Sequence, residues 1–318
     1  MESKDLFFRT GIDAGSTTLK IAVLDESGKV VFSSYLRHNT DIKGTLLTVL
    51  DNMKKKIGDV VTKVCVTGSA GIGISERVGL KFIQEVVASA EAVSGLFGKI
   101  GTLLDIGGED SKMIIFDESG NADIRMNGNC AGGTGAFIDQ MASLMSVQVE
   151  ELSNLAADHT KIYPVASRCG VFAKTDVQNL LSREIPKGDI AASIFNAVVT
   201  QVMNTLARGS SIKPPLLFSG GPLAFIPFLR DLFLKRIGLT ESDAVIPEKP
   251  ELFPAMGSAY YAKDNELSMT VSELISLITS SKESKTAGGG RLDPLFKSEE
   301  YFRKWYENRY MKVTRAVP

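Results

Sequence analysis

The sequence predicts an α/β fold of two related lobes, and two observations carry this prediction. The first is an internal repeat in which a glycine-containing hairpin pattern occurs twice. The second is a predicted strand, glycine turn and helix in series around residue 220, an order of elements that is typical of α/β folds. A chain of 318 residues is long enough to bury the cores of two such lobes.

The repeat aligns IDAGSTTLKIAVLDESG at residues 12–28 with LDIGGEDSKMIIFDESG at residues 104–120 without a gap. Asp13 matches Asp105, and both copies end in DESG. Each copy predicts a strand, a tight turn of acidic and glycine residues, a second strand, and a hairpin turn before a third strand. Two such hairpins in tandem predict two lobes that are built alike.

Both hairpin turns have the residue types of a phosphate-binding site. Glycine lets backbone amides approach phosphate oxygens, hydroxyl groups add donors, and a nearby carboxylate suits hydrated magnesium. Ordinary β-turns are also rich in glycine and aspartate, but two copies in register favour the phosphate site. The candidates are Asp13, Gly15, Ser16 and Thr17 in the first turn and Asp105, Gly107, Gly108, Glu109 and Asp110 in the second.

Two lysines and a third glycine turn extend the predicted site. Lys20 and Lys112 follow the phosphate turns, and each is expected either to reach a phosphate or to face solvent. PPLLFSGGPLAFIPFLRDLFLKRIG at residues 214–238 predicts a strand, a Ser-Gly-Gly turn and an amphipathic helix, so Gly220 and Gly221 are candidate nucleotide contacts. By contrast, GSAGIGIS at residues 68–75 is interpreted as a turn between the lobes.

Composition and cysteine usage limit the classes of function. A net charge of −1 gives no reason to expect nucleic acid or an anionic membrane as the partner. We expect a cytoplasmic protein, because we find no apolar run long enough to span a bilayer and no signal-peptide pattern. Three cysteines in such a protein argue against disulfides, and a four-cysteine metal site needs a second chain. Cys65 is expected to be buried and structural, whereas Cys130 and Cys169 precede predicted helices.

Two phosphate hairpins followed by a Ser-Gly-Gly turn resemble the actin, Hsp70 and sugar-kinase class of ATPases. That resemblance implies two ribonuclease-H-like lobes with nucleotide in the cleft between them. Within this class, IDAGSTTLKIAVLD, LLDIGGEDSK, NCAGGTGAF and CGVFAKTDV look like the ATP-dependent activator family of 2-hydroxyacyl-CoA dehydratases and benzoyl-CoA reductases. The match runs from about residue 9 to about residue 263, and its two cysteine motifs are its most specific part.

The resemblance implies an ATP-hydrolysing electron-transfer homodimer with one [4Fe–4S] cluster between its subunits. Cys130 and Cys169 of each chain are then the cluster ligands. Ferredoxin or flavodoxin donates single electrons, and the acceptor is an iron–sulfur enzyme of the dehydratase, reductase or double-cubane type. Asp13 and Asp105 hold Mg²⁺ through water, and Asp105 or Glu109 aligns the water that attacks ATP.

We expect four segments along the chain, with two other functions left open. The expected segments are a first ATPase lobe at 1–100, a second lobe with the cluster cysteines at 101–252, helices returning to the first lobe at 253–279, and a linker with a C-terminal extension at 280–318. The extension is rich in aromatic and charged residues, which suits a helix packed on the body or a docking segment. The alternative functions are a sugar or small-molecule kinase and a nucleotide-gated binding module without redox activity.

Overall fold

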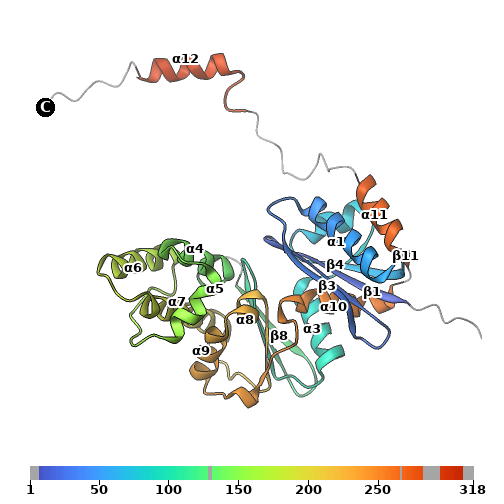
Figure 1. Cartoon of the computed structure of the whole chain (residues 1–318), viewed down its shortest axis with the longest axis horizontal. Helices are drawn as coiled ribbons and strands as arrows, with labels where there is room; N and C mark the ends of the chain where they lie inside the picture. The colour runs from blue at the N-terminus through green and yellow to red at the C-terminus, as the bar shows by residue number, and fades with distance from the viewer. Residues whose placement is uncertain (1–6, 128–130, 266, 282–293, 311–318) are drawn as a thin grey trace, which may run out of the picture. The chain divides into compact units, whose positions relative to one another are not determined.

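The computed structural model describes residues 7–127, 131–265, 267–281 and 294–310 of the chain. The chain divides into a larger unit, Met1–Ser281, and a small C-terminal unit, Lys282–Pro318 (Figure 1). The larger unit contains two lobes, each built on one mixed β-sheet with helices packed on it. The predicted α/β fold of two lobes is therefore confirmed.

The first lobe is built on a six-stranded sheet in the order β11–β4–β1–β2–β3, with β5 also paired to β4. β1 is antiparallel to β2 and parallel to β4. The last five residues of β1 are all buried, as expected for a central strand that is covered on both faces. The strands are β1 (Phe8–Ala14), β2 (Thr18–Leu24), β3 (Val30–Arg37), β4 (Val61–Thr67), β5 (Lys81–Phe82) and β11 (Met269–Thr270).

Helices cover both faces of this first sheet. Ile12 of β1 packs with Leu50 and Leu274 from the helices on one face. Gly11 points to the other face, where α10 lies so close that a Cβ on Gly11 would overlap the carbonyl group of Ala255. The helices are α1 (Ile42–Ile57), α2 (Gly71–Val78), α3 (Glu85–Ala92), α10 (Phe253–Tyr261) and α11 (Val271–Ser280), with the short turns η1 (Val93–Phe97) and η6 (Ala262–Asp264).

The second lobe is built on a five-stranded sheet in the order β10–β9–β6–β7–β8. Its helices supply most of the largest apolar cluster in the molecule. The strands are β6 (Thr102–Ile106), β7 (Ser111–Phe116), β8 (Ala122–Asn127), β9 (Leu216–Ser219) and β10 (Ala244–Val245). The helices are α4 (Gly135–Met145), α5 (Val149–Ala157), α6 (Gly170–Ser182), α7 (Lys187–Val202), α8 (Gly221–Phe225) and α9 (Pro227–Ile237), with the short turns η2 (Ala131–Gly133), η3 (Met203–Ala207), η4 (Glu241–Asp243) and η5 (Pro250–Leu252).

The sequence repeat is a structural repeat. β1–β2–β3 and β6–β7–β8 are both antiparallel meanders. Asp13 pairs with Lys20 across the first hairpin, and Asp105 pairs with Lys112 at the same place in the second. The predicted order of strands, acidic turn and DESG turn is thus confirmed in both lobes.

Two helices are shared by the lobes. The N-terminal end of α10 and the end of α3 contribute Phe253 and Ala92 to an apolar cluster with Leu103 and Ile114 of the second sheet. The same two helices also pack on the first sheet and on one another. Gly257 permits this contact, because a Cβ there would overlap the carbonyl group of Ala88. Any change in the angle between the lobes must therefore act on the packing of α3 and α10.

The structure corrects two interpretations of glycine-rich segments. Residues 68–75 are not a turn between the lobes: Gly68 turns the chain with a φ of +89°, and α2 starts at Gly71 within the first lobe. Residues 222–238 do not form one helix but two, α8 and α9. Pro227 causes the break, because proline lacks the N–H group and clashes with the preceding turn of a helix.

One helical stretch corrects the expectation about membrane-spanning runs. Lys187–Ala207, which joins α7 to η3, is long and apolar enough to cross a membrane, with a mean hydropathy of 1.4. However, 72% of its most apolar 18-residue window is buried inside the protein. Both properties follow from its place as the central helix of the second lobe, since a helix surrounded by other elements is apolar on all sides.

Candidate functional site

The first predicted phosphate turn joins β1 to β2. The N–H of Gly15 donates to the carbonyl oxygen of Thr18 at 3.0 Å, which closes the turn. Ser16 is exposed and Thr17 is half-buried, so both hydroxyl groups are available to a ligand. A turn of this form presents backbone amides and hydroxyl donors together, as phosphate oxygens require.

The second predicted phosphate turn joins β6 to β7 and faces the first. The N–H of Gly107 donates to the carbonyl oxygen of Asp110 at 2.9 Å, and Gly108 and Glu109 at the tip are exposed. A Cβ on Gly108 would lie only 2.9 Å from the Oγ1 of Thr17. The two turns, although far apart in the sequence, therefore meet at one place between the lobes.

Asp13 lies buried beneath the first turn with one carboxylate oxygen unpaired. Its Oδ2 accepts a hydrogen bond from the Nζ of Lys20 at 2.7 Å. Its Oδ1 has no hydrogen-bond partner among the described residues, although Asp13 is 0% exposed. Gly68 keeps the space beside this oxygen open, because a Cβ on Gly68 would lie 2.5 Å from Oδ1. A buried acceptor without a partner is costly, which is typical of a site that a ligand completes.

Asp105 and Lys112 form a buried network beneath the second turn. Asp105 accepts a short hydrogen bond from the hydroxyl of Ser219, and its Oδ1 lies 3.7 Å from the Nζ of Lys112. The same Nζ lies 2.9 Å from the carboxylate of Asp110 and 2.9 Å from that of Glu85. The side chain of Lys112 is 1% exposed. The structure thus excludes a solvent-facing Lys112, one of the two alternatives that the sequence left open.

Burial and charge act against each other in this network. Burial lowers the pKa of Lys20 and Lys112, but the neighbouring carboxylates outweigh it, so both pKa values are raised and both lysines stay charged. Burial also raises the pKa of Asp13 and Asp110 above the usual value for aspartate. Burial has the same effect on Glu85, but Lys112 and Lys20 outweigh it and hold its pKa below the usual value.

The donor set under the turns fits a magnesium ion bound through phosphate and water. The four carboxylates of Asp13, Glu85, Asp105 and Asp110 face the two ammonium groups of Lys20 and Lys112, so two negative charges are in excess. Within the described ranges, no group of three or more His, Cys, Asp or Glu side chains is arranged to hold a metal. Magnesium is commonly held by one or two carboxylates together with water and phosphates, so this set fits Mg²⁺ that arrives with a nucleotide.

The Ser-Gly-Gly turn lies between β9 and α8. Gly220 has a φ of +91°, and a Cβ there would overlap the carbonyl oxygen of Ile106, so only glycine fits. A Cβ on Gly221 would lie 3.0 Å from the hydroxyl of Tyr35, which belongs to β3 of the first lobe. The ring of Tyr35 also meets that of Phe225 edge-on, with centroids 5.8 Å apart. An aromatic side chain of one lobe thus borders the glycine turn of the other.

Helix α4 is hydrogen-bonded directly to the second phosphate turn. Its first two amides, those of Gly135 and Ala136, donate to the carbonyl oxygens of Gly107 and Gly108 at 3.0 and 2.8 Å. A shift of this turn must therefore shift the N-terminal end of α4. These hydrogen bonds were not predicted from the sequence, because their partners lie 28 residues apart and no local pattern links them.

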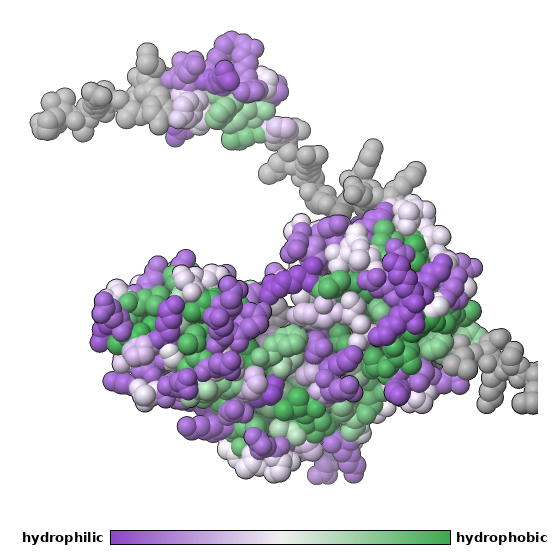
Figure 2. Space-filling model, viewed as in Figure 1, coloured by the Kyte–Doolittle hydropathy of each residue, from purple (hydrophilic) through white to green (hydrophobic). Residues whose placement is uncertain are grey.

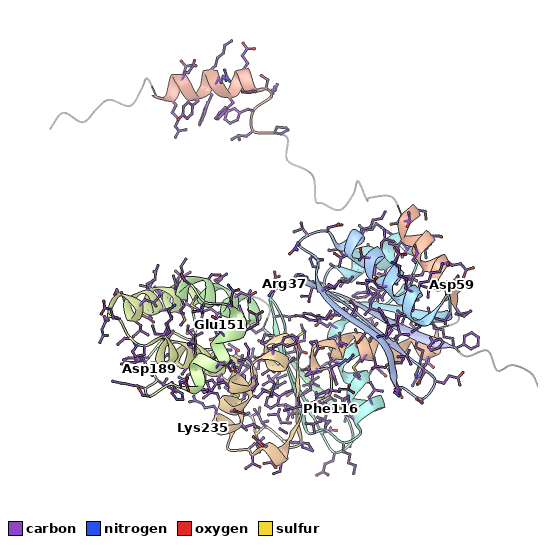
Figure 3. The ribbon with its side chains drawn as sticks, viewed as in Figure 1. Arg37, Asp59, Phe116, Glu151, Asp189 and Lys235 are labelled. Atoms are coloured by element: carbon purple, nitrogen blue, oxygen red, sulfur yellow. The ribbon has the colours of Figure 1, made fainter. Side chains whose placement is uncertain are left out.

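The first lobe also contacts α4. Arg37 ends β3 at the side of the first lobe that faces the second (Figure 3), and its guanidinium lies 3.2 Å from the carboxylate of Asp139 in α4. At another point of β3, the Nζ of Lys249, just before η5, donates to the Oγ of Ser33 at 2.7 Å. Helix α4 is thus linked to β3 of the first lobe as well as to the phosphate turn of the second.

Two of the three cysteines lie among the described residues. Cys169 is the N-cap residue of α6 and is half-buried, and it is followed by Val171 and Phe172, which are 73% and 66% exposed. Cys65 in β4 is 0% exposed, and burial raises the pKa of its thiol, as expected of a structural cysteine. Cys130, the other candidate cluster ligand, lies outside the described residues, just before η2.

Several residues of the site were not predicted as site residues from the sequence, among them Gly68, Glu85 and His38. His38 is 5% exposed, and its Nε2 lies 3.1 Å from the carbonyl oxygen of Gly15. The N–H of Thr40 donates to its Nδ1 at 3.1 Å, so the ring proton is on Nε2 and is donated to Gly15. A single histidine after a strand gives no sequence signal for this role.

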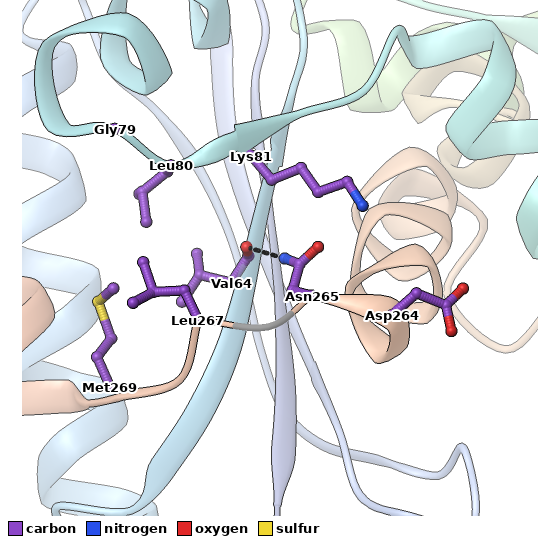
Figure 4. A pocket seen from close by; sticks show the side chains of 8 residues that line it. All are labelled: Val64, Gly79, Leu80, Lys81, Asp264, Asn265, Leu267 and Met269. Atoms are coloured by element: carbon purple, nitrogen blue, oxygen red, sulfur yellow. Dashed lines mark hydrogen bonds between the residues drawn. The ribbon is translucent and has the colours of Figure 1, made fainter.

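A separate cavity of about 420 Å³ lies at the edge of the first sheet (Figure 4). Leu80, Leu267 and Met269 give it apolar walls, and the side-chain amide of Asn265 donates to the carbonyl oxygen of Val64 at 2.7 Å. None of its lining residues belongs to the phosphate turns. The candidate site is therefore the junction of the three glycine turns.

The profile of the BadF/BadG/BcrA/BcrD ATPase family matches residues 10–262, which include all three glycine turns and both cysteine motifs. The chain belongs to the BadF/BadG/BcrA/BcrD ATPase family. This membership confirms the resemblance inferred from the sequence motifs.

Characterised members of this family are similar over most of their length. The chain is 30% identical over 261 residues to the 2-hydroxyisocaproyl-CoA dehydratase activator of Clostridioides difficile, covering 81% of this chain and 95% of that protein. It is 32% identical over 218 residues to the (R)-2-hydroxyglutaryl-CoA dehydratase activating ATPase of Acidaminococcus fermentans, covering 67% and 82%. The solved structure of the Clostridium difficile activator with bound ADPNP has a TM-score of 0.71 at 28% identity, covering 87% of this chain and 98% of that one.

Proposed function

We propose that the chain is an ATP-hydrolysing activator that passes single electrons to an iron–sulfur partner enzyme. The observation that carries the proposal is the hydrogen bonding of α4 to the second phosphate turn. Helix α4 begins five residues after Cys130, so the turn that binds phosphate and the segment that binds the cluster are parts of one connected structure. Membership of an ATPase family whose relatives are dehydratase activators supports the same function.

ATP binds at the three glycine turns. The amides of Gly15 and Gly107 close the two turns. The backbone amides at the tips of these turns and the hydroxyls of Ser16 and Thr17 donate to phosphate oxygens, and the open turn at Gly220 receives the adenosine. Lys112 stays with its carboxylates and offsets part of their negative charge. Lys20 lies in β2, just after the first phosphate turn, and its ammonium group is next to the carboxylate of Asp13.

Asp13 and Asp105 orient the water molecules of a magnesium ion that accompanies the nucleotide. The unpaired Oδ1 of Asp13 is the oxygen with room for this role. Ser219 and Lys112 hold the carboxylate of Asp105 in one orientation. A carboxylate held in this way can keep a water molecule in a defined position. Magnesium supplies positive charge that offsets the negative charge of the phosphates.

Glu109 is the acid that we assign to the hydrolytic water. It lies exposed at the tip of the second turn, and within the described part of the chain it makes no hydrogen bond or ion pair. Asp105, the other candidate, is 2% exposed and already bonded. A carboxylate that is free to accept a proton or a hydrogen bond from water is the better base.

Two copies of the chain hold one [4Fe–4S] cluster through Cys130 and Cys169 of each. The donor set fits, since one chain has only these two candidate thiols besides buried Cys65, and four thiolates are needed. The cluster, when bound, accepts and gives up one electron at a time. The N-terminus of α6, where the side chain of Cys169 makes no capping hydrogen bond, favours the negative charge that such a cluster brings to Cys169.

The donor in this proposal is reduced ferredoxin or flavodoxin, and the acceptor is an iron–sulfur enzyme of the dehydratase or reductase type. Closure of the lobes on ATP moves the second phosphate turn and therefore the start of α4. This motion changes the surface that the homodimer presents to its acceptor. A cytoplasmic location fits these partners, and no role for nucleic acid or a membrane is proposed.

The test is the iron and acid-labile sulfide content of anaerobically purified protein, measured together with ATP turnover. We expect close to four of each per dimer. Cys169→Ser should remove the iron and leave ATP binding intact, whereas Cys65→Ser, the matched control at a buried cysteine, should retain both. Iron-free wild-type protein that still hydrolyses ATP would rule out the electron-transfer role and leave an ATPase of another kind.

A further inference from the structure

In the described part of the C-terminal unit, residues 294–310, the chain forms the helix α12 (Glu299–Tyr310). The hydroxyl of Ser298 accepts a hydrogen bond from the N–H of Tyr301 at 3.2 Å, as an N-cap residue does. Phe296, just before the cap, packs on Phe302 and Trp305 with ring centroids 5.1 Å from each. These contacts explain why a helix starts here.

One face of α12 is aromatic and exposed. Tyr301, Phe302 and Trp305 are 59%, 41% and 41% exposed, and Leu295 before the helix is 87% exposed. Hydrophilic residues lie along one side of this helix and hydrophobic ones gather on the other (Figure 2). Aromatic side chains at a spacing of three and four residues form one stripe, the pattern by which a helix docks on a partner.

A helix of this length is marginal in water by itself. Isolated helices shorter than about 12–15 residues gain most of their stability from packing an apolar face. The segment also lies beyond the family match, which ends at residue 262. It is therefore an addition to the ATPase body, and its exposed stripe needs an occupant.

The charges along α12 indicate what that occupant is. Glu299, which also pairs with Arg303 of its own helix at 3.1 Å, lies beside the aromatic stripe in the first turn. Arg309 lies on the stripe in the last turn, over the ring of Trp305 at 5.1 Å. An antiparallel second copy brings Glu299 of each helix towards Arg309 of the other. A parallel copy would oppose like charges at both ends, which is unfavourable.

We propose that α12 pairs with α12 of a second copy of this chain, antiparallel and aromatic face to aromatic face. Such a pair has two-fold symmetry, so each contact occurs twice. A pair of helices this short buries less than the roughly 1,600 Å² of a standard interface, so it is weak alone and strengthens a dimer that is also joined elsewhere. The proposal does not depend on the cluster or on ATP hydrolysis.

Trp305 is the only tryptophan of the chain, so its fluorescence reports on this face directly. The full chain should be diluted in a Cys169→Ser background, which prevents bridging through a cluster, while Trp305 emission, acrylamide quenching and molar mass are followed. We expect a red shift, stronger quenching and a fall to monomer mass on dilution. Phe302→Ser should weaken the association about tenfold or more, and Glu307→Gln on the opposite face should not.

A charge exchange tests the orientation without touching the aromatic residues. Glu299→Arg and Arg309→Glu should each prevent association alone, because like charges then meet at both ends. An equal mixture of the two variants should restore it, although each helix carries a charge that its own dipole disfavours.

Three results would overturn the proposal. Trp305 that is shielded at every concentration in a monomer means that the helix is covered within one chain. Trp305 that is exposed at every concentration means that no second copy covers it. If Glu299→Arg and Arg309→Glu associate to the same extent in a mixture as each does alone, then Glu299 and Arg309 do not contact one another. The Cys169→Ser samples are expected to lack iron. Iron-free wild-type protein would therefore count only against the cluster, so the two failures are distinguishable.

Discussion

The ammonium group of Lys112 lies 2.9 Å from the carboxylate of Glu85, and this ion pair joins the second phosphate hairpin to the start of α3. Helix α3 is one of the two helices that both sheets share. Lys112 also bonds Asp110 at the phosphate turn. The buried side chain of Lys112 therefore connects the second phosphate turn to α3, a helix that packs on both sheets.

Removal of Lys112 should be strongly destabilising. Lys112→Met leaves the buried carboxylate of Asp105 and the partly exposed carboxylates of Asp110 and Glu85 without their nearest ammonium group. Breaking a buried ion pair costs about 3–5 kcal/mol. We expect a large fall in the midpoint of urea unfolding, and weaker ATP binding in the protein that still folds. Lys29→Met removes a lysine that is exposed in the structure and is the control. Equal midpoints for the two variants would contradict the buried network.

Gly68 should be needed for magnesium-dependent nucleotide binding. A methyl group at this position would overlap the carbonyl group of Ala14 and lie 2.5 Å from the free Oδ1 of Asp13. Gly68→Ala should therefore abolish the stimulation of ATP binding by Mg²⁺, measured by calorimetry with and without the ion.

The matched control for that variant is Gly79→Ala. Gly79 also has a positive φ, of +69°, but a Cβ there would meet nothing within 4 Å. Both variants incur the backbone cost of about 1–2 kcal/mol for a left-handed alanine. A loss of Mg²⁺ stimulation in both would show that backbone strain, and not the space beside Asp13, is responsible.

The parts of the site that were predictable from the sequence are local ones. The pairs Asp13–Lys20 and Asp105–Lys112 each lie across one hairpin, and a hairpin is fully specified by neighbouring residues. Glu85 was missed because an acidic residue at the start of a helix is ordinary, and its partner follows 27 residues later.

Gly68 was missed for a similar reason. It reaches Asp13 only because β4 runs parallel to β1, with Thr67 opposite Asp13. A parallel pairing needs a crossover between the strands, so no local pattern reveals it. The pairing proposed for α12 has no local signal either, because the sequence shows only an extension rich in aromatic and charged residues.

The repeated DESG turns should contribute stability that depends on pH. The side-chain amide of Asn121 and the backbone N–H groups of Asn121 and Ser119 donate to Asp117 and hold its pKa below the usual value. A carboxylate with a depressed pKa stabilises the fold above its unfolded pKa, and this contribution is lost as pH falls through the folded pKa. Asp117→Asn keeps the acceptor oxygen and removes the charge.

We therefore expect Asp117→Asn to be less stable than wild type at pH 7 and equally stable in strong acid. Urea unfolding measured at each pH tests this. Asp25 plays the same part in the first lobe, where the hydroxyl of Ser27 lowers its pKa, so Asp25→Asn should behave alike. If the difference in stability between wild type and these variants stays constant with pH, the charge of the aspartate does not stabilise the turns.

His38 should support the first phosphate turn, and its loss should weaken ATP binding. Its ring donates to the carbonyl oxygen of Gly15 and accepts from the N–H of Thr40. His38→Ala leaves both groups without this partner, at a cost of about 1–3 kcal/mol in stability, and frees the turn to move. We expect about a tenfold weaker affinity for ATP, which corresponds to 1.4 kcal/mol.

His159 provides the comparison that separates this role from general destabilisation. It lies in the second lobe, where its Nδ1 contacts the carbonyl oxygen of Ala156 at 2.7 Å and its ring meets Phe228 edge-on. His159→Ala should lower the unfolding midpoint by a similar amount and leave the affinity for ATP unchanged, because no phosphate turn depends on it. If both variants weaken ATP binding equally, the effect comes from stability. If only His38→Ala does, the ring holds Gly15 in the geometry that phosphate requires.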